Sequence, residues 1–70
     1  MIIDLYGREI EVIRRNNQWI VFYRGSEGKK RVARDITIPG NVAEPELVAY
    51  LSDIYHEYSN VRSPVVRVIG

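Results

Sequence analysis

His56 is the only histidine of this chain, and the chain contains no cysteine. Asp53 stands three residues before His56 and Glu57 follows it directly, so a helix would place Asp53 and His56 on the same face. A bound metal ion usually takes three or four protein ligands, and this spacing supplies two. We therefore expect no metal site and interpret His56 as a solvated surface residue.

Other patterns that carry chemistry are equally sparse. Glu9 and Glu11 alternate along one predicted strand face, but no apolar surroundings are expected there that would raise a carboxyl pKa for acid catalysis. Residues 25–30 contain two glycines and two lysines without the spacing of a phosphate-binding loop, and they do not lead into a helix. The sequence therefore predicts a non-enzymatic protein with no catalytic residues and no cofactor.

Composition limits the range of structures and locations. Seventy residues, 46% of them hydrophobic, are enough for a single compact domain over residues 1–70. A net charge of +1 is too balanced for a general polyanion binder, and the absence of cysteine favours a reducing compartment such as the cytoplasm. Residues 1–7 show neither a basic start nor a long apolar run, so we expect neither a signal peptide nor a membrane span.

The first half of the chain alternates apolar and polar residues with a period of two, as strands do. Gly7-Arg8 and Asn16-Asn17 suit two-residue hairpin turns, and residues 25–28 suit a longer loop. The predicted strands are residues 2–6, 9–15, 18–24 and 29–38.

The second half changes to the helical period. Pro45 suits the first turn of a helix, and Leu47, Leu51, Ile54 and Tyr58 then form one apolar stripe over about four turns. Residues 65–69 form a last short strand. The predicted fold is α+β, a four-stranded antiparallel meander with one amphipathic helix packed on one face and a short C-terminal edge strand, in the order 5-1-2-3-4.

The predicted turns define which residues share a face. The first turn places Leu5 opposite Ile10 and Ile3 opposite Val12. The second turn places Val12 opposite Val21, and the longer loop places Val21 opposite Val32. The inner face, toward the helix, would then carry Ile3, Leu5, Ile10, Val12, Trp19, Val21, Tyr23, Val32, Ile36 and Ile38.

The opposite face of the sheet would carry a second apolar row. Ile2, Ile13, Ile20 and Ala33 would lie in this row with Phe22 beside it. One helix cannot cover both faces, and an exposed apolar row is typical of an interface. The alternatives are that the C-terminal segment covers the row or that it is ordinary surface hydrophobicity. The candidate interface residues are Ile2, Ile13, Ile20 and Phe22.

Charge is unevenly distributed along the chain. Residues 43–60 contain acidic residues and no lysine or arginine, whereas basic residues gather in residues 24–34. This candidate basic patch suits nucleic-acid binding, or it marks a sheet edge protected against aggregation. Its members are Arg24, Lys29, Lys30, Arg31 and Arg34.

Arg14 and Arg34 would flank Trp19 in the predicted register. One interpretation is stacking of a guanidinium group on the indole ring at the rim of the core. The other is a notch for an anion or ligand beneath the helix.

Four segments carry a resemblance to a known family: residues 6–12, 19–23, 35–39 and 51–57. Together they resemble a family of small, uncharacterised bacterial proteins. The resemblance implies a bacterial cytoplasmic protein and transfers no activity. Our leading hypothesis is a small interaction module that forms a homodimer or binds a protein partner through the open sheet face, with no membrane association. The alternative is nucleic-acid binding through residues 24–34.

Overall fold

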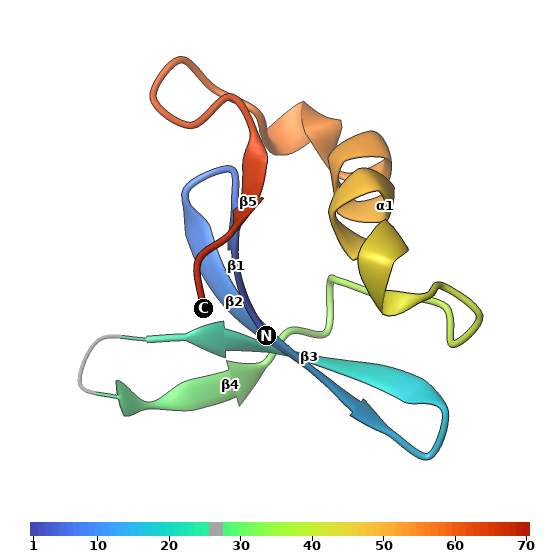
Figure 1. Cartoon of the computed structure of the whole chain (residues 1–70). Coiled ribbons are helices and arrows are strands. Elements are labelled where there is room, and N and C mark those ends of the chain that lie inside the picture. The colour runs from blue at the N-terminus through green and yellow to red at the C-terminus, as the bar shows by residue number, and fades with distance from the viewer. Residues whose placement is uncertain (26–27) are drawn as a thin grey trace.

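The computed structural model describes residues 1–25 and 28–70, so two positions of the predicted loop at residues 25–28 lie outside the described residues. It shows one antiparallel sheet in the order β4-β3-β2-β1-β5 and one α-helix, which confirms the predicted α+β fold and strand order (Figure 1). The strands are β1 (Ile2–Leu5), β2 (Arg8–Arg15), β3 (Gln18–Arg24), β4 (Lys30–Val32) and β5 (Val66–Val68).

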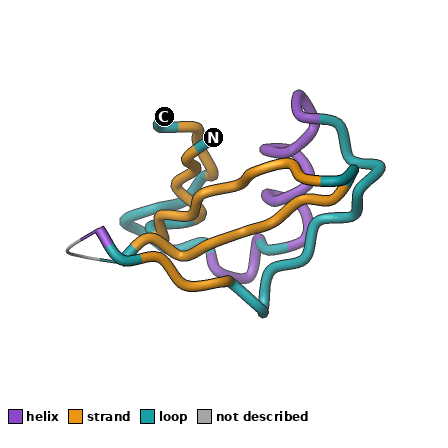
Figure 2. The backbone as a smooth tube through the Cα atoms, turned by 90° about the horizontal axis from the view of Figure 1, so that it is seen from below, coloured by secondary structure: helices purple, strands orange, loops and turns teal. Residues whose placement is uncertain are grey.

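The sheet is open and strongly twisted. In Figure 1, β1 and β5 stand upright beside the helix, whereas β3 and β4 run across the view. The two ends of the chain lie together (Figure 2), and the amide of Ile2 donates a hydrogen bond of 2.7 Å to the carbonyl oxygen of Gly70. The last strand is therefore held against the first.

The helical segment begins and ends with 3₁₀ turns. Glu44–Glu46 and His56–Tyr58 are 3₁₀ helices, and α1 (Leu47–Ile54) lies between them. The predicted four-turn helix is thus an eight-residue α-helix with 3₁₀ extensions. Leu47 and Leu51 are fully buried as predicted, but Ile54 is 49% exposed because it lies at the outer edge of the apolar stripe. In the described residues, no helix is long and apolar enough to cross a membrane.

The core lies between the inner face of the sheet and α1. Its fully buried side chains come from β1, β2 and the helix, with Trp19 and Tyr23 partly buried at its border. Ile36 and Ile38 are also buried, although the segment that carries them is not a strand. The buried hydrophobic residues are Ile3, Leu5, Tyr6, Ile10, Val12, Val21, Ala33, Ile36, Ile38, Leu47, Leu51 and Val66.

The first hairpin turn differs from the prediction by one position. Tyr6 and Gly7, with φ of 52° and 92°, form its centre, and Ile3 pairs with Ile10. Positive φ at both central residues is typical of a type I′ turn. The left-handed conformation of Tyr6 is held because its hydroxyl group donates to the carbonyl oxygen of Ser52 at 3.1 Å. The register moves by two residues, so each side chain keeps its predicted face.

The predicted register between the third and fourth strands is wrong by one residue. Phe22 pairs with Val32 and Arg24 with Lys30, because the connection between these strands is one residue longer than expected. A one-residue shift exchanges the two faces of a strand. Val32 therefore lies on the outer face and is 55% exposed, whereas Ala33 turns inward and is buried. The strand also ends at Val32, well before the predicted limit at residue 38.

Candidate functional site

The outer face of the sheet carries a row of charged side chains across all five strands. The register aligns Lys30 with Arg24 and Glu9 with Asp4, and an ion pair joins Arg24 to Glu9, with basic residues at both ends of the row. Arg24 Nη1 lies 2.7 Å from Glu9 Oε1, and Arg67 Nη2 lies 3.6 Å from Asp4 Oδ2. From edge to edge the row is Lys30, Arg24, Glu9, Asp4 and Arg67.

The apolar residues of the outer face lie beyond this charged row. Ile13 and Ile20 pair directly across β2 and β3, and both are partly buried. Phe22 pairs with Val32 on one side and with Glu11 on the other. The predicted pairing of Ile13 and Ile20 is confirmed. Ala33, predicted beside Ile20 in this row, is instead buried, and Val32 lies on the outer face opposite Phe22.

Ile2 is not adjacent to the isoleucine pair. It lies opposite Glu11, because the first hairpin has a register two residues away from the predicted one. A Cβ atom placed on Gly70 would lie 3.6 Å from Ile2 Cδ1, so the C-terminal residue packs beside Ile2. The candidate interface is therefore centred on Ile13 and Ile20, and Ile2 lies at its margin.

Glu11 lies within the apolar part of the outer face. Its side chain is 23% exposed, and its Oε1 lies 2.8 Å from Lys30 Nζ. The hydrogen bond from Lys30 holds the pKa of the Glu11 carboxyl below its usual value, against partial desolvation. Lys30 Nζ also lies 5.7 Å from the centre of the Phe22 ring. Lys30 thus compensates the only acidic charge between the isoleucine pair and the charged row in the described part of this face.

The structure divides the predicted basic patch between two faces. Arg24 and Lys30 lie on the outer face in ion pairs with Glu9 and Glu11. Arg31 pairs with Tyr23 and so lies on the inner face, while Arg34 is exposed in the turn that follows β4. Lys29 lines a hollow at the end of the sheet. These residues do not form one continuous positive surface.

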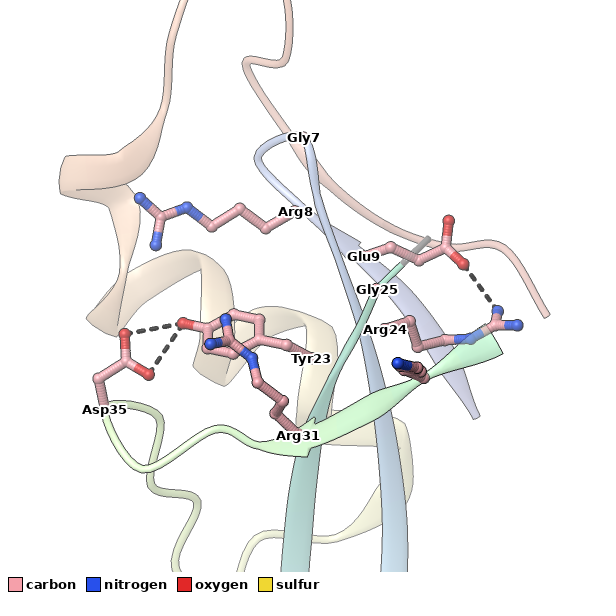
Figure 3. Close-up of a pocket in the computed structure, with 9 residues that line it drawn as sticks. Gly7, Arg8, Glu9, Tyr23, Arg24, Gly25, Arg31 and Asp35 are labelled. Carbon is pink, nitrogen blue, oxygen red and sulfur yellow. Dashed lines mark hydrogen bonds and ion pairs between the residues drawn. The ribbon is translucent and has the colours of Figure 1, made fainter. Parts of the chain in front are cut away.

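This hollow has a volume of about 700 Å³ and lies where the first hairpin turn, the end of β3 and the start of β4 meet. Figure 3 shows Arg8, Tyr23, Arg31 and Asp35 together on one side of the strands, with the pair Glu9–Arg24 on the other side. The Tyr23 hydroxyl group donates a hydrogen bond to the Asp35 carboxylate, 2.7 and 2.9 Å from its two oxygens. Sequence patterns did not predict this cluster.

Tyr23 has a perturbed pKa. Its partial burial and its hydrogen bond to Asp35 raise the pKa of the phenol, because both favour the neutral hydroxyl group. The guanidinium group of Arg8 opposes this shift, since hydrogen bonding from Arg8 and its positive charge both favour the phenolate. Arg8 also lies over the ring of Tyr58, with Cζ 4.3 Å from the ring centre. Arg8 therefore connects the hollow to the last helical turn.

At the other end of the sheet, Arg14 stacks on Trp19, with Arg14 Cζ 4.7 Å from the centre of the indole ring. The Arg14 guanidinium group donates to the carbonyl oxygens of Gly40 and Val42, at 2.8 and 3.4 Å. These contacts support the stacking interpretation over a ligand notch, because the backbone takes the donors. Arg34 does not flank Trp19, since β4 ends before reaching that position.

His56 is exposed, and its Nδ1 lies 3.4 Å from the carbonyl oxygen of Asp53. The contact involves the backbone of Asp53 and not its carboxylate. In residues 1–25 and 28–70, no group of three or more histidine and acidic side chains is arranged to hold a metal ion.

The sequence matches a protein-family model over residues 1–70, and that family is described as Domain of unknown function (DUF7661). The chain belongs to this family. The match confirms the expected resemblance to an uncharacterised family and leaves the bacterial origin as an expectation. Comparison with curated proteins and with solved structures gave no match.

Sequence patterns did not reveal the hollow, because its lining residues come from four separate segments of the chain. The predicted register of the fourth strand places Arg31 on the outer face and Asp35 within the strand, whereas Arg31 lies on the inner face and Asp35 in a turn. A signal was nevertheless available in the alternation of the strands. Arg8 is two residues from Ile10, and Tyr23 is two residues from Val21, so both side chains lie on the inner face of the sheet. Two polar side chains with inward parity at one end of a sheet indicate a site at the end of the core.

Proposed function

We propose that this domain is a small, non-enzymatic interaction module that forms a homodimer through the outer face of its sheet. The observation that carries this proposal is the direct pairing of Ile13 and Ile20 on the face of the sheet opposite the buried core. Paired apolar side chains on an uncovered sheet face are typical of interaction surfaces. A location in the bacterial cytoplasm is part of the proposal, since a chain without cysteine suits a reducing compartment.

The charges next to the isoleucine pair favour a second copy of this chain as the partner. Glu11, Ile13 and Arg15 alternate along β2 and share the outer face, with an acid and a base at equal distances from the isoleucine. A two-fold axis across the strands at Ile13 would place Glu11 of each copy against Arg15 of the other. Face-to-face sheets keep their strands within about 30° of each other, so this alignment is geometrically accessible. The face is therefore complementary to itself.

The two kinds of side chain would contribute differently to such a dimer. Apolar area removed from water contributes about 25 cal/mol per Å², so Ile13 and Ile20 would supply most of the affinity. The flanking charges would set the orientation and disfavour other alignments. The dimer should accordingly persist at high salt concentration.

The first test is sedimentation of the Ile20→Lys variant at several protein concentrations. Its circular dichroism spectrum should match that of the wild type, because Ile20 points away from the core. Its dimer dissociation constant should rise by at least about tenfold, because an ammonium group would be placed at the centre of the interface. The matched control is Ile54→Lys, which changes an isoleucine of the helix layer that is 49% exposed. A wild type that remains monomeric at its highest soluble concentration would overturn the proposal.

A pair of charge variants tests the alignment itself. Arg15→Glu should weaken its own dimer by placing two carboxylates together, and Glu11→Arg should do the same with two guanidinium groups. Mixing the two variants should restore dimerisation, because each copy then meets the opposite charge. Light scattering of the separate and mixed variants measures this effect. Equal association of all three samples would exclude this alignment.

The alternative function, nucleic-acid binding through residues 24–34, has one supporting observation. The Phe22 ring and the Lys30 ammonium group lie 5.7 Å apart, and a ring beside a cation suits a stacked base and its phosphate. However, Arg24 and Lys30 are already paired with Glu9 and Glu11, and a nucleic acid would have to displace these carboxylates. Binding to an oligonucleotide that weakens steeply with salt would favour this alternative over the dimer.

A further inference from the structure

The hollow at the end of the sheet carries an excess of positive charge. Among the described residues 1–25 and 28–70, four basic and two acidic side chains line it, and one of the basic ones, Arg24, is matched by Glu9 at 2.7 Å. Asp35 accepts a hydrogen bond from Tyr23 and is the other acid among the lining residues that the structure describes. Within the described lining, Arg8, Lys29 and Arg31 therefore face a single carboxylate, so this lining favours an anion.

The guanidinium groups of Arg8 and Arg31 retain donors for a ligand, although Arg8 also interacts with the Tyr23 hydroxyl oxygen. Arg8 presents one face to the ring of Tyr58, and stacking of this kind leaves the N–H groups at the edge of the guanidinium plane. Within residues 1–25 and 28–70, no carboxylate or carbonyl oxygen accepts a hydrogen bond from either arginine. Figure 3 shows both side chains extending toward Tyr23 from different strands.

The size and polarity of the hollow indicate what kind of anion it would hold. Its volume of about 700 Å³ exceeds the size of an inorganic anion, and pockets of about 300–1,000 Å³ hold small organic molecules. A phosphate monoester carries a charge of about −1.5 to −2 at neutral pH, which matches the excess positive charge. Arginine also binds phosphate through two parallel hydrogen bonds.

We propose that this hollow binds the phosphate group of a small phosphorylated molecule, with Arg8 and Arg31 donating to the phosphate oxygens. Lys29 adds charge, and Tyr23, fixed by its hydrogen bond to Asp35, forms the wall between the two arginines. A continuous polyanion fits less well, because Glu9 and Glu11 lie on the adjoining outer face. The site is separate from the proposed dimer face, which is centred on Ile13 and Ile20.

The binding test is an amide chemical-shift titration with inorganic phosphate and with ribose 5-phosphate at constant ionic strength. Saturable shifts are expected at Arg8, Tyr23, Arg31 and Asp35, and ribose 5-phosphate should bind more tightly because its sugar fills more of the hollow. Absence of saturable shifts up to about 10 mM, where a millimolar site would be mostly occupied, would overturn the proposal.

A variant locates the binding and a matched variant controls for charge. Arg31→Gln should raise the dissociation constant for ribose 5-phosphate by about tenfold, because a charge-assisted pair of hydrogen bonds is lost. Arg67→Gln removes one positive charge from the opposite edge strand and should change the constant by less than about twofold. Equal effects of the two variants would show that general charge attraction, and not this hollow, holds the ligand.

A third ligand separates a small molecule from a nucleic acid. A short oligothymidylate should bind no more tightly than ribose 5-phosphate if the hollow recognises a single phosphate group. Binding at least about tenfold tighter, with shifts that extend to Phe22 and Lys30, would overturn the proposal in favour of a single-stranded nucleic acid.

Discussion

The indole nitrogen of Trp19 donates a hydrogen bond of 2.8 Å to the carbonyl oxygen of Val42. This bond joins the hairpin of β2 and β3 to the segment that leads into the helix. The Arg14 guanidinium group, stacked on the same indole ring, donates to the neighbouring carbonyl oxygen of Gly40 at 2.8 Å. The segment before the helix thus obtains partners for its backbone without belonging to a strand.

Replacing Trp19 with phenylalanine should lower the free energy of unfolding by about 1–2 kcal/mol, because the carbonyl oxygen of Val42 loses a partner and the ring becomes smaller. Urea denaturation followed by far-UV circular dichroism measures this change, since Trp19 is the only tryptophan and fluorescence is lost with it. Tyr50→Phe is the control, because the hydroxyl group of Tyr50 makes an exposed hydrogen bond of 3.3 Å to Thr37 that water can replace. Equal losses in both variants would contradict the importance of the bond to Val42.

Gly40→Ala should destabilise the fold by about 1–3 kcal/mol, as other substitutions that overfill a packed site do. A Cβ atom on Gly40 would collide with the carbonyl oxygen of Asn17, and this atom is backbone that cannot rotate away. The control is Gly70→Ala, where the new Cβ would lie 3.6 Å from Ile2 Cδ1 in ordinary contact. Thermal unfolding of the two variants compares them. A midpoint for Gly40→Ala that equals that of the wild type would show that the turn at Asn16-Asn17 yields easily.

Tyr23 should make stability depend on alkaline pH. Burial and the hydrogen bond to Asp35 raise its pKa in the folded state above the usual value of 10.0. The unfolded chain therefore loses this proton first, and the stabilisation, complete below pH 10.0, is lost as the pH rises through the folded pKa. Urea unfolding between about pH 9 and pH 11 should show a smaller decline for Tyr23→Phe than for the wild type.

A phenolate absorbance titration tests the cause of this shift. Asp35→Asn should lower the pKa of Tyr23 part of the way toward its usual value, because the negative acceptor is removed while the burial remains. An unchanged pKa in Asp35→Asn would show that burial alone accounts for the shift. A steeper alkaline decline for Tyr23→Phe than for the wild type would reverse the sign of the predicted contribution.

The parts of the fold that were predictable from sequence are those with strong local signals. Asn16 and Asn17 adopt φ of 52° and 61°, as their residue types favour, and the predicted register of β2 and β3 is confirmed. The turn before β2 differs because Tyr6, a residue with no such preference, is held in the left-handed region by its contact with Ser52. That contact is tertiary and joins two residues that are 46 positions apart in the chain, so no local sequence pattern could indicate it.

The outer face was largely predictable, and the hollow was not. The alternation of side chains between the two faces is enough to place Ile13 and Ile20 on the same face. The two-residue shift in the register of β1 and β2 leaves every side chain on its predicted face. The hollow depends on the length of the connection before β4, where one extra residue moves Arg31 to the inner face beside Tyr23. Sequence patterns define strand faces well, but they do not determine how many residues a longer loop takes.

The position of β1 between β2 and β5 has a consequence for the order of folding. The hairpins of β1, β2 and β3 bring together residues that are near in the chain. Pairing of β5 with β1 instead closes a long loop that contains the whole helical segment. We therefore expect β5 to join the sheet last and to detach first, so that its amides exchange with solvent through local opening. Because β5 supplies Val66 to the core, this opening would briefly uncover the side of the core beside Leu5 while the meander stays intact.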